Sequence, residues 1–260
     1  MLNHLASLPS AFQIALHVGA SVLLTFLLMM LIHTAIPFRI RRQHNDVIGF
    51  IVGVVAAFYG LIIASVLVIG INRFDHAEQV VENEANLIGD IVRLARATSS
   101  QIESPVKQLA AQYLEDVISK EWPAQMQGQR TTLGLQTLAE LSRVVSRYEP
   151  RTPRETAYYS QLVQTLNKLY DARRERIFLA SEGIAGEVWV VTLAGGILTV
   201  CFVLLFGIEN RRIHFLLASF LAVSLALIFA LVAIFDKPFQ GDMAASDEPY
   251  RLIREQVATN

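Results

Sequence analysis

Few residues in this 260-residue chain could do chemistry, and they are scattered. The six histidines include no pair at the spacing i, i+4, and the one cysteine, Cys201, lies inside an apolar run. The sequence contains no nucleophile elbow, no glycine-rich phosphate loop, and no HExxH or CxxC motif. We therefore expect neither an enzyme nor a cofactor.

A small acidic face is the nearest approach to a metal site. Asp75, Glu78 and Glu82 share one helix face, with His76 beside them. Carboxylates and imidazoles can bind divalent cations. Exposed acidic faces more commonly hold only water and counterions, so we predict no metal site here.

One carboxylate occupies a position where an apolar residue is expected. Glu84 interrupts a stripe with spacings of three and four residues, which otherwise contains Phe74, Ala77, Val81, Ile88, Ile91 and Ala95. A charge inside a packed seam is costly unless it is paired. A later stripe with the same spacing carries Arg173 and Arg176. We predict an ion pair of Glu84 with Arg173 or Arg176, within or between subunits. The pair could fix register, line a water-filled passage or be purely structural. Alternatively, the drift of a 3.6-residue helix turns Arg176 to solvent and gives its place to Ile177.

The elements that must position these residues begin with four apolar runs. The chain is 53% hydrophobic, with a mean hydropathy of +0.42. The runs lack Asp, Glu, Lys and Arg and cover residues 12–36, 47–71, 188–208 and 213–235. Each run is long enough as a helix to cross a bilayer. We predict an integral membrane protein with four helices, whose N-terminus is not a cleaved signal peptide.

The charges of the short loops predict the orientation. Arg39, Arg41 and Arg42 follow the first run, and Arg211 and Arg212 precede the fourth. The positive-inside rule places both loops in the cytoplasm, so both termini and residues 72–187 are expected outside it. A net charge of −1 without a basic patch argues against a nucleic-acid partner.

The polar middle segment is predicted to be helical. The first helix continues from the second run to Thr98, and Ser104-Pro105 is expected to begin a helix that ends near Trp122. Pro123 and Gly128 mark a loop, and a shorter helix covers 132–147. Thr152-Pro153-Arg154-Glu155 is a capping box, and the helix it begins should continue through Gly183 and Gly186 into the third run.

The predicted organisation is therefore all-α, with a helical domain inserted between membrane helices 2 and 3, which extend from the membrane as a stalk. Residues 1–71 form membrane helices 1 and 2, residues 72–187 the extramembrane domain, residues 188–235 membrane helices 3 and 4, and residues 236–260 a C-terminal tail.

The second run has two faces with different interpretations. Small residues at about one-turn spacing allow helices to approach closely, and they are Gly49, Gly53, Ala57 and Gly60. Large apolar residues could form hydrophobic rings around an axis if several copies assemble, and they are Phe50, Val54, Phe58 and Ile62. The alternative is ordinary packing of all these residues within one subunit. In the first run, His17 is better explained as a hydrogen-bonded histidine than as a proton relay.

Several motifs together resemble the bacterial four-helix membrane proteins termed bestrophin-like. They are Glu84-Ala85, Glu121-Trp122-Pro123, Arg173 with Arg176, and the D-x-P-F-x-G pattern at Asp236–Gly241. A more distant resemblance in plan joins this chain to bestrophins, which are pentameric anion channels with a hydrophobic neck in the second helix. The bestrophin aromatic-acidic pattern beyond the neck is absent, since this chain has Arg73-Phe74-Asp75-His76 there. Bestrophins also hold their soluble region in the cytosol, which is the alternative to the orientation predicted above.

Two functions follow as expectations. The first is an oligomeric, bestrophin-like channel or pore for small anions, with Arg73 at the mouth attracting the anion or, alternatively, only reaching lipid headgroups. The second is a non-conducting membrane scaffold or envelope-stress sensor whose helical domain binds a protein partner.

Overall fold

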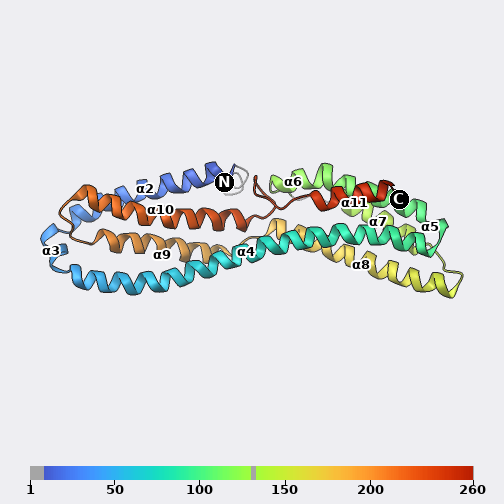
Figure 1. Cartoon of the computed structure of the whole chain (residues 1–260), viewed down its shortest axis with the longest axis horizontal. Coiled ribbons are helices and arrows are strands. Elements are labelled where there is room, and N and C mark those ends of the chain that lie inside the picture. The colour runs from blue at the N-terminus through green and yellow to red at the C-terminus, as the bar shows by residue number, and fades with distance from the viewer. Residues whose placement is uncertain (1–8, 130–132, 260) are drawn as a thin grey trace. The chain divides into compact units, whose positions relative to one another are not determined.

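The computed structural model describes residues 9–129 and 133–259, and within these residues every regular element is a helix. The prediction of an all-α chain is therefore confirmed for the described part. In chain order the helices are α2 (Ser10–Ala35), α3 (Phe38–Gln43), α4 (Asn45–Thr98), α5 (Ser100–Asp116), the π-helix η1 (Val117–Glu121), α6 (Trp122–Met126), α7 (Leu133–Ser146), α8 (Pro153–Ser181), α9 (Gly186–Leu204), α10 (Arg211–Asp236) and α11 (Glu248–Thr259) (Figure 1).

Four stretches of helix are long and apolar enough to cross a membrane. They lie in α2, in α4, in the segment Pro153–Leu204 and in α10. Their apolar windows contain at most two charged residues, which suits a hydrocarbon environment. Each of the four runs expected from the sequence falls largely within one of these segments.

The chain divides into two compact units. We call the first the apolar unit; it comprises the described residues up to Arg73 together with Gly183–Asp236. The second, the polar unit, comprises Phe74–Glu182 together with the residues from Lys237 onward.

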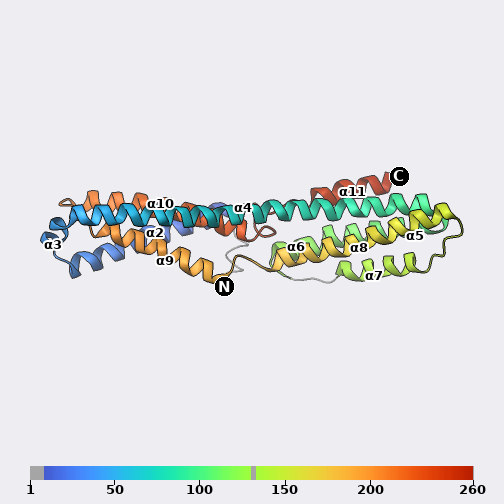
Figure 2. The ribbon, with the colours of Figure 1, turned by 90° about the horizontal axis from the view of Figure 1, so that it is seen from below.

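In the apolar unit, α10 packs against α2 and α9 (Figures 1 and 2). Small residues of α10, Ala218 and Ala222, are buried against Met29 of α2 and Val200 of α9. The first half of α4 contributes a narrow buried stripe that includes Tyr59 and Ile63. Because so little of α4 is buried here, much of its apolar surface stays open in the single chain.

In the polar unit, the second half of α4 packs with α5, α7, α8 and α11 around one core (Figure 2). Residues of the seam noted in the sequence, such as Ala77, Val81 and Ile88, are at most 1% exposed. The C-terminal segment also belongs to this core, because Tyr250 and Ile253 of α11 are buried in it. A segment that looks like a tail in the sequence thus has a packing role.

The helix that was predicted to begin at Ser104-Pro105 begins earlier in the structure. Helix α5 begins at Ser100, and Pro105 lies inside it. The Ser99 side chain accepts a hydrogen bond from the backbone N–H of Gln101, which satisfies one of the free donors of the first turn. The earlier serine therefore serves as the N-cap, and Ser104 does not.

The loop predicted at Pro123 is also displaced. The chain passes through the π-helix η1 directly into α6, whose second residue is Pro123. Pro123 has no N–H to donate, so one backbone hydrogen bond is missing where the π-helix meets α6. The turn comes only after Met126, where Gly128 has a φ of +71°, a value that favours glycine.

The predicted helix near 132–147 is observed as α7, although residue 132 lies outside the described residues. The capping box is confirmed at its first half, since the Thr152 hydroxyl oxygen accepts a hydrogen bond of 3.1 Å from Glu155 N. The Glu155 carboxylate does not return to Thr152 N; it accepts from Arg151 N and from the Tyr148 hydroxyl, each at 2.8 Å.

The predicted continuity of helix through Gly183 and Gly186 is wrong. Helix α8 ends at Ser181, Glu182 is extended with ψ 162°, and α9 begins at Gly186. Within the apolar unit the Asp236 carboxylate holds the new start, because it accepts hydrogen bonds from Ile184 N and from Trp189 Nε1. The helix is interrupted between Ser181 and Gly186, so the Ile184 N–H needs an acceptor other than a helical carbonyl. The Asp236 carboxylate is that acceptor.

Candidate functional site

A cluster of buried charges forms the centre of the polar unit. Glu84 of α4 is 0% exposed and receives two hydrogen bonds from Arg176 of α8, at 2.7 Å from Nε and 3.1 Å from Nη2. The Tyr113 hydroxyl of α5 donates a third, at 2.6 Å. Of the two partners expected for Glu84, the structure brings Arg176 and not Arg173 to it.

Arg173 binds a second carboxylate instead. Its Nη1 and Nη2 donate to Glu121 at 2.9 and 2.7 Å, a bidentate pairing. Glu121 also accepts from Arg176 Nη2 at 2.9 Å and from Gly134 N at 2.9 Å. Arg176 therefore bridges both carboxylates, and the two arginines balance the two glutamates in charge.

The π-helix explains how Glu121 reaches this cluster. In an uninterrupted α-helix from α5 through α6, each side chain would be rotated from the previous one by the same angle. A π-turn contains more residues per turn, so the side chains that follow it point in a different direction around the helix axis. Glu121 is the last residue of η1 and is 0% exposed. Sequence reasoning noted Glu121 only within a family motif and missed it as the partner of Arg173. The Glu-Trp-Pro signal alone did not reveal the π-turn.

The electrostatics keep these groups in fixed protonation states. Burial raises the pKa of Glu121, but Arg176 and Arg173 outweigh burial and hold it below its ordinary value. Burial lowers the pKa of Arg176, but the Glu84 carboxylate overcomes this and raises it well above the ordinary value. Burial, with Glu84 as a second cause, raises the pKa of Tyr113 well above its ordinary value. At neutral pH Glu121 and Arg176 are thus charged and Tyr113 is neutral, an arrangement suited to joining helices.

Tyr250 completes the surroundings of Arg176. The Arg176 guanidinium carbon lies 5.9 Å from the centre of the Tyr250 ring, in the range of a cation–π contact. The same ring lies edge-on to Trp122, with 5.9 Å between centroids. The cluster therefore connects α4, α5, α8 and α11 with the segment from η1 to α6.

The large apolar residues proposed as a constriction are open in the single chain. Phe50 is 75% exposed, Val54 42%, Phe58 68% and Ile62 45%. They follow one another at four-residue steps and so share one broad side of α4. Arg73, further along the same helix, is half-buried.

The small residues of α4 are mostly open as well. A side-chain carbon added at Gly49 would contact Phe206 at 3.7 Å, but at Gly53 or Gly60 it would meet nothing within 4 Å. Ala57 is exposed. Of the three glycines named in this stripe, Gly49 alone has a close neighbour among the described residues.

The close helix packing that the structure does show lies elsewhere. The Tyr59 hydroxyl of α4 donates to the Thr192 carbonyl of α9 at 2.8 Å. A side-chain carbon added at Gly195 would lie 2.5 Å from Tyr59 Cε2, so only glycine leaves room for the ring. Sequence reasoning missed this contact, although the adjacent glycines Gly195-Gly196 were a signal for it.

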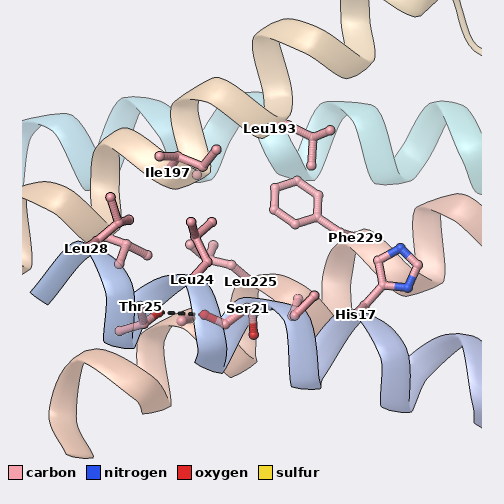
Figure 3. A pocket seen from close by; sticks show the side chains of 14 residues that line it. His17, Ser21, Leu24, Thr25, Leu28, Leu193, Ile197, Leu225 and Phe229 are labelled. Atoms are coloured by element: carbon pink, nitrogen blue, oxygen red, sulfur yellow. Dashed lines mark hydrogen bonds between the residues drawn. The ribbon is translucent and has the colours of Figure 1, made fainter. Parts of the chain in front are cut away.

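The apolar unit also contains a cavity of about 210 Å³ between α2, α9 and α10 (Figure 3). Apolar residues, among them four leucines and Phe229, line most of it, and Ser21, Thr25 and His17 lie along the α2 wall. These polar groups bond to their own helix: Thr25 donates to the Ser21 carbonyl at 2.8 Å, and His17 Nδ1 lies 2.7 Å from the Gln13 carbonyl. His17 is thus half-buried and hydrogen-bonded.

Long apolar helices joined to a helical polar unit define the class of this molecule as a helical membrane protein. The chain belongs to the Bestrophin-like family, whose domain matches residues 19–250. Comparison with curated proteins gives no significant match.

Solved structures show the same fold at low sequence identity. A crystal structure described as a membrane protein has a TM-score of 0.67, with 10% identity over 95% of this chain and 97% of the other. A variant of a bacterial bestrophin homologue from Klebsiella pneumoniae has a TM-score of 0.66, with 10% identity over 95% of this chain and 98% of the other. Another structure of that homologue has a TM-score of 0.63, with 12% identity over 94% and 95%. These structures show the shared fold, and the family match shows that the chain is a membrane protein of the Bestrophin-like family.

Proposed function

We propose that this protein is an oligomeric ion channel in which several copies of α4 surround an axis and form a hydrophobic constriction. The observation that carries the proposal is the unequal burial of α4. Tyr59 and Ile63 pack within the chain, whereas Phe50 and Phe58 are largely exposed. A helix that packs on one narrow stripe leaves the rest of its surface for lipid or for other subunits.

The open small residues support assembly over simple lipid exposure. When α4 is drawn at about 100° per residue, Gly53 and Gly60 lie on a different side from Phe58, whereas Ala57 lies beside Phe50, where the two sides meet. Small side chains allow a neighbouring helix to approach closely. One side of α4 would then contact the next subunit, and the large apolar side would face the axis.

The proposed arrangement in the membrane has four spanning helices, with the polar unit inserted between the second and third. The basic loops would lie in the cytoplasm, and residues 72–187 and both termini would lie outside it, in the bacterial inner membrane. The transported ions would be small anions, with Arg73 near the mouth. The resemblance to bestrophins supports the pore but places the soluble region on the opposite side.

Flux from reconstituted vesicles tests the proposal. Wild type should conduct chloride, and Phe58→Ala should change the flux several-fold because it widens or rewets a hydrophobic constriction. Phe220→Ala is the matched control, since Phe220 lies on α10 and is 62% exposed. The control should leave the flux unchanged. The absence of flux from wild type, or a monomeric state in detergent and in nanodiscs, would reject the channel and favour a scaffold.

A further inference from the structure

Arg41 stands out among the buried arginines of the described residues. It is 4% exposed, as deeply buried as Arg173 at 5%. Arg173 and Arg176 each bind a carboxylate, whereas no carboxylate lies at ion-pair distance from Arg41 in the described part of the chain. A buried charge without a counterion is costly, so an anion supplied from outside the chain would stabilise it.

The surroundings of Arg41 use only part of its hydrogen-bonding capacity. Nη1 donates to the Leu204 carbonyl at 3.3 Å and to the Phe206 carbonyl at 3.1 Å, near the C-terminal end of α9. These bonds complement the negative end of the helix. Nε is buried and has no hydrogen-bond partner among the described residues. A planar guanidinium that keeps a free Nε–H is well formed to bind an oxyanion.

Two imidazoles bring further nitrogens to the same place. The rings of His33 on α2 and His214 on α10 are 5.3 Å apart between centroids. His33 Nε2 and His214 Nδ1 are both buried and have no hydrogen-bond partner in the described residues. Arg41 is close enough to act on both rings electrostatically. Three buried nitrogens with unmet hydrogen bonds thus gather at one end of the apolar unit, and such groups are rare in proteins.

The local backbone holds this arrangement firmly. Asn45 Oδ1 accepts from Gly207 N at 2.8 Å, which joins the start of α4 to the link between α9 and α10. A side-chain carbon at Gly207 would lie 2.4 Å from the backbone nitrogen of Arg42, so the two loops touch directly. The nitrogens are therefore positioned by the fold.

The chemistry of the three nitrogens selects the ligand. A metal cation is disfavoured by the Arg41 charge and by Arg211, which adds positive potential. Arg41 Nε and His33 Nε2 can donate to anionic oxygens. His214 Nε2 lies 3.1 Å from the Val203 carbonyl and donates to it, so the neutral ring presents Nδ1 as an acceptor for a hydroxyl.

We propose that Arg41, His33 and His214 form a binding site for a phosphate group that carries a hydroxyl nearby. An anionic lipid with a glycerol headgroup and free hydrogen phosphate both have this chemistry. Arg211, whose charge acts on Arg41, favours anionic lipid phosphates at a membrane surface. The site goes beyond the proposed channel function, and binding there does not require conduction.

The test measures retained lipid on the full-length protein. Wild type, Arg41→Gln and Arg42→Gln are purified in detergent, exposed to phosphatidylglycerol or phosphatidylcholine, and weighed intact by native mass spectrometry. Arg42 is the matched control because it lies on the same loop with a side chain 62% exposed and bonds Glu209. We expect wild type and Arg42→Gln to retain phosphatidylglycerol in preference to phosphatidylcholine, and Arg41→Gln to bind it about tenfold more weakly.

Two further experiments distinguish a lipid headgroup from free phosphate and provide a second variant in case Arg41→Gln misfolds. Displacement of phosphatidylglycerol by inorganic phosphate, but not by chloride at equal ionic strength, would identify free phosphate as the ligand; no displacement by either would identify the lipid headgroup. If Arg41→Gln does not fold, His33→Phe keeps an aromatic ring, removes Nε2 and should weaken phosphatidylglycerol binding. Equal losses of phosphatidylglycerol binding in Arg41→Gln and Arg42→Gln would overturn the site. A wild-type protein that neither prefers phosphatidylglycerol nor binds inorganic phosphate would also overturn it.

Discussion

Arg173 and Glu121 are 52 residues apart in the chain, yet two parallel hydrogen bonds of 2.9 and 2.7 Å join them. Both side chains are almost completely buried. Arg176, one helical turn further along α8, connects this pair to Glu84. The polar unit is therefore held at its centre by a balanced set of charges that are almost completely buried.

Removal of one carboxylate from this set should be strongly destabilising. In Glu121→Gln, Arg173 loses its bidentate partner and becomes an unpaired buried charge, which costs about 3–5 kcal/mol. Chemical denaturation in detergent, followed by circular dichroism, measures this loss. Glu175→Gln is the control, because Glu175 is half-exposed and its partner among the described residues is His76, and its effect should stay within about 0.5 kcal/mol. Equal stabilities of the two variants would contradict the assigned role.

The Tyr113 hydroxyl should contribute on its own. Its bond to Glu84 is 2.6 Å long and has a charged acceptor, so Tyr113→Phe should lower the free energy of unfolding by about 1.5–3 kcal/mol. The same denaturation experiment measures it. Tyr159→Phe, a partly buried tyrosine at the edge of the same core, should have a smaller effect. A Tyr113→Phe protein as stable as wild type would show that the hydrogen bond adds nothing.

Acid should destabilise the polar unit at a pH set partly by Glu121. Its folded pKa lies below the ordinary 4.5 because Arg176 and Arg173 outweigh burial. The associated stability is therefore fully present above about pH 4.5 and is lost as the pH falls through the folded pKa. Unfolding free energies measured from neutral to acid pH should decline in this window for wild type. Glu121→Gln should show a shallower decline, and an unchanged slope would argue against the linkage.

The contact of Gly195 with Tyr59 predicts an asymmetry between glycines. Gly195→Ala places a carbon against the Tyr59 ring, so the helices must separate, at a cost of about 1–3 kcal/mol. Gly53→Ala meets no atom within 4 Å in the single chain and should preserve the fold. Thermal unfolding compares the two variants. Size-exclusion chromatography of Gly53→Ala additionally tests the proposed subunit contact, since a bulkier residue there should weaken assembly.

Local patterns in the sequence were enough to predict the all-helical class and to identify Glu84 as a charged residue in an apolar stripe. Long charge-free runs predict apolar helices because an uncharged helix of that length suits hydrocarbon. The three-four spacing predicts that Glu84 is buried because side chains at that spacing share one face. The stripe on the later helix contains two candidate partners for Glu84, Arg173 and Arg176. Both have the helical spacing, so spacing alone could not show which of them pairs with Glu84.

Tertiary structure decided which charges meet. The π-turn at Val117–Glu121 changes the direction in which the following side chains point and places Glu121 opposite Arg173. A regular helical spacing of about 3.6 residues cannot predict this change. The C-terminal helix α11 brings Tyr250 to Arg176 from the far end of the chain. Arg41, which by sequence is one of several loop arginines, is buried and donates hydrogen bonds to carbonyls at the end of α9 and in the link after it. Sequence spacing fixes which residues share a face, whereas partners distant in the chain are chosen by packing between helices.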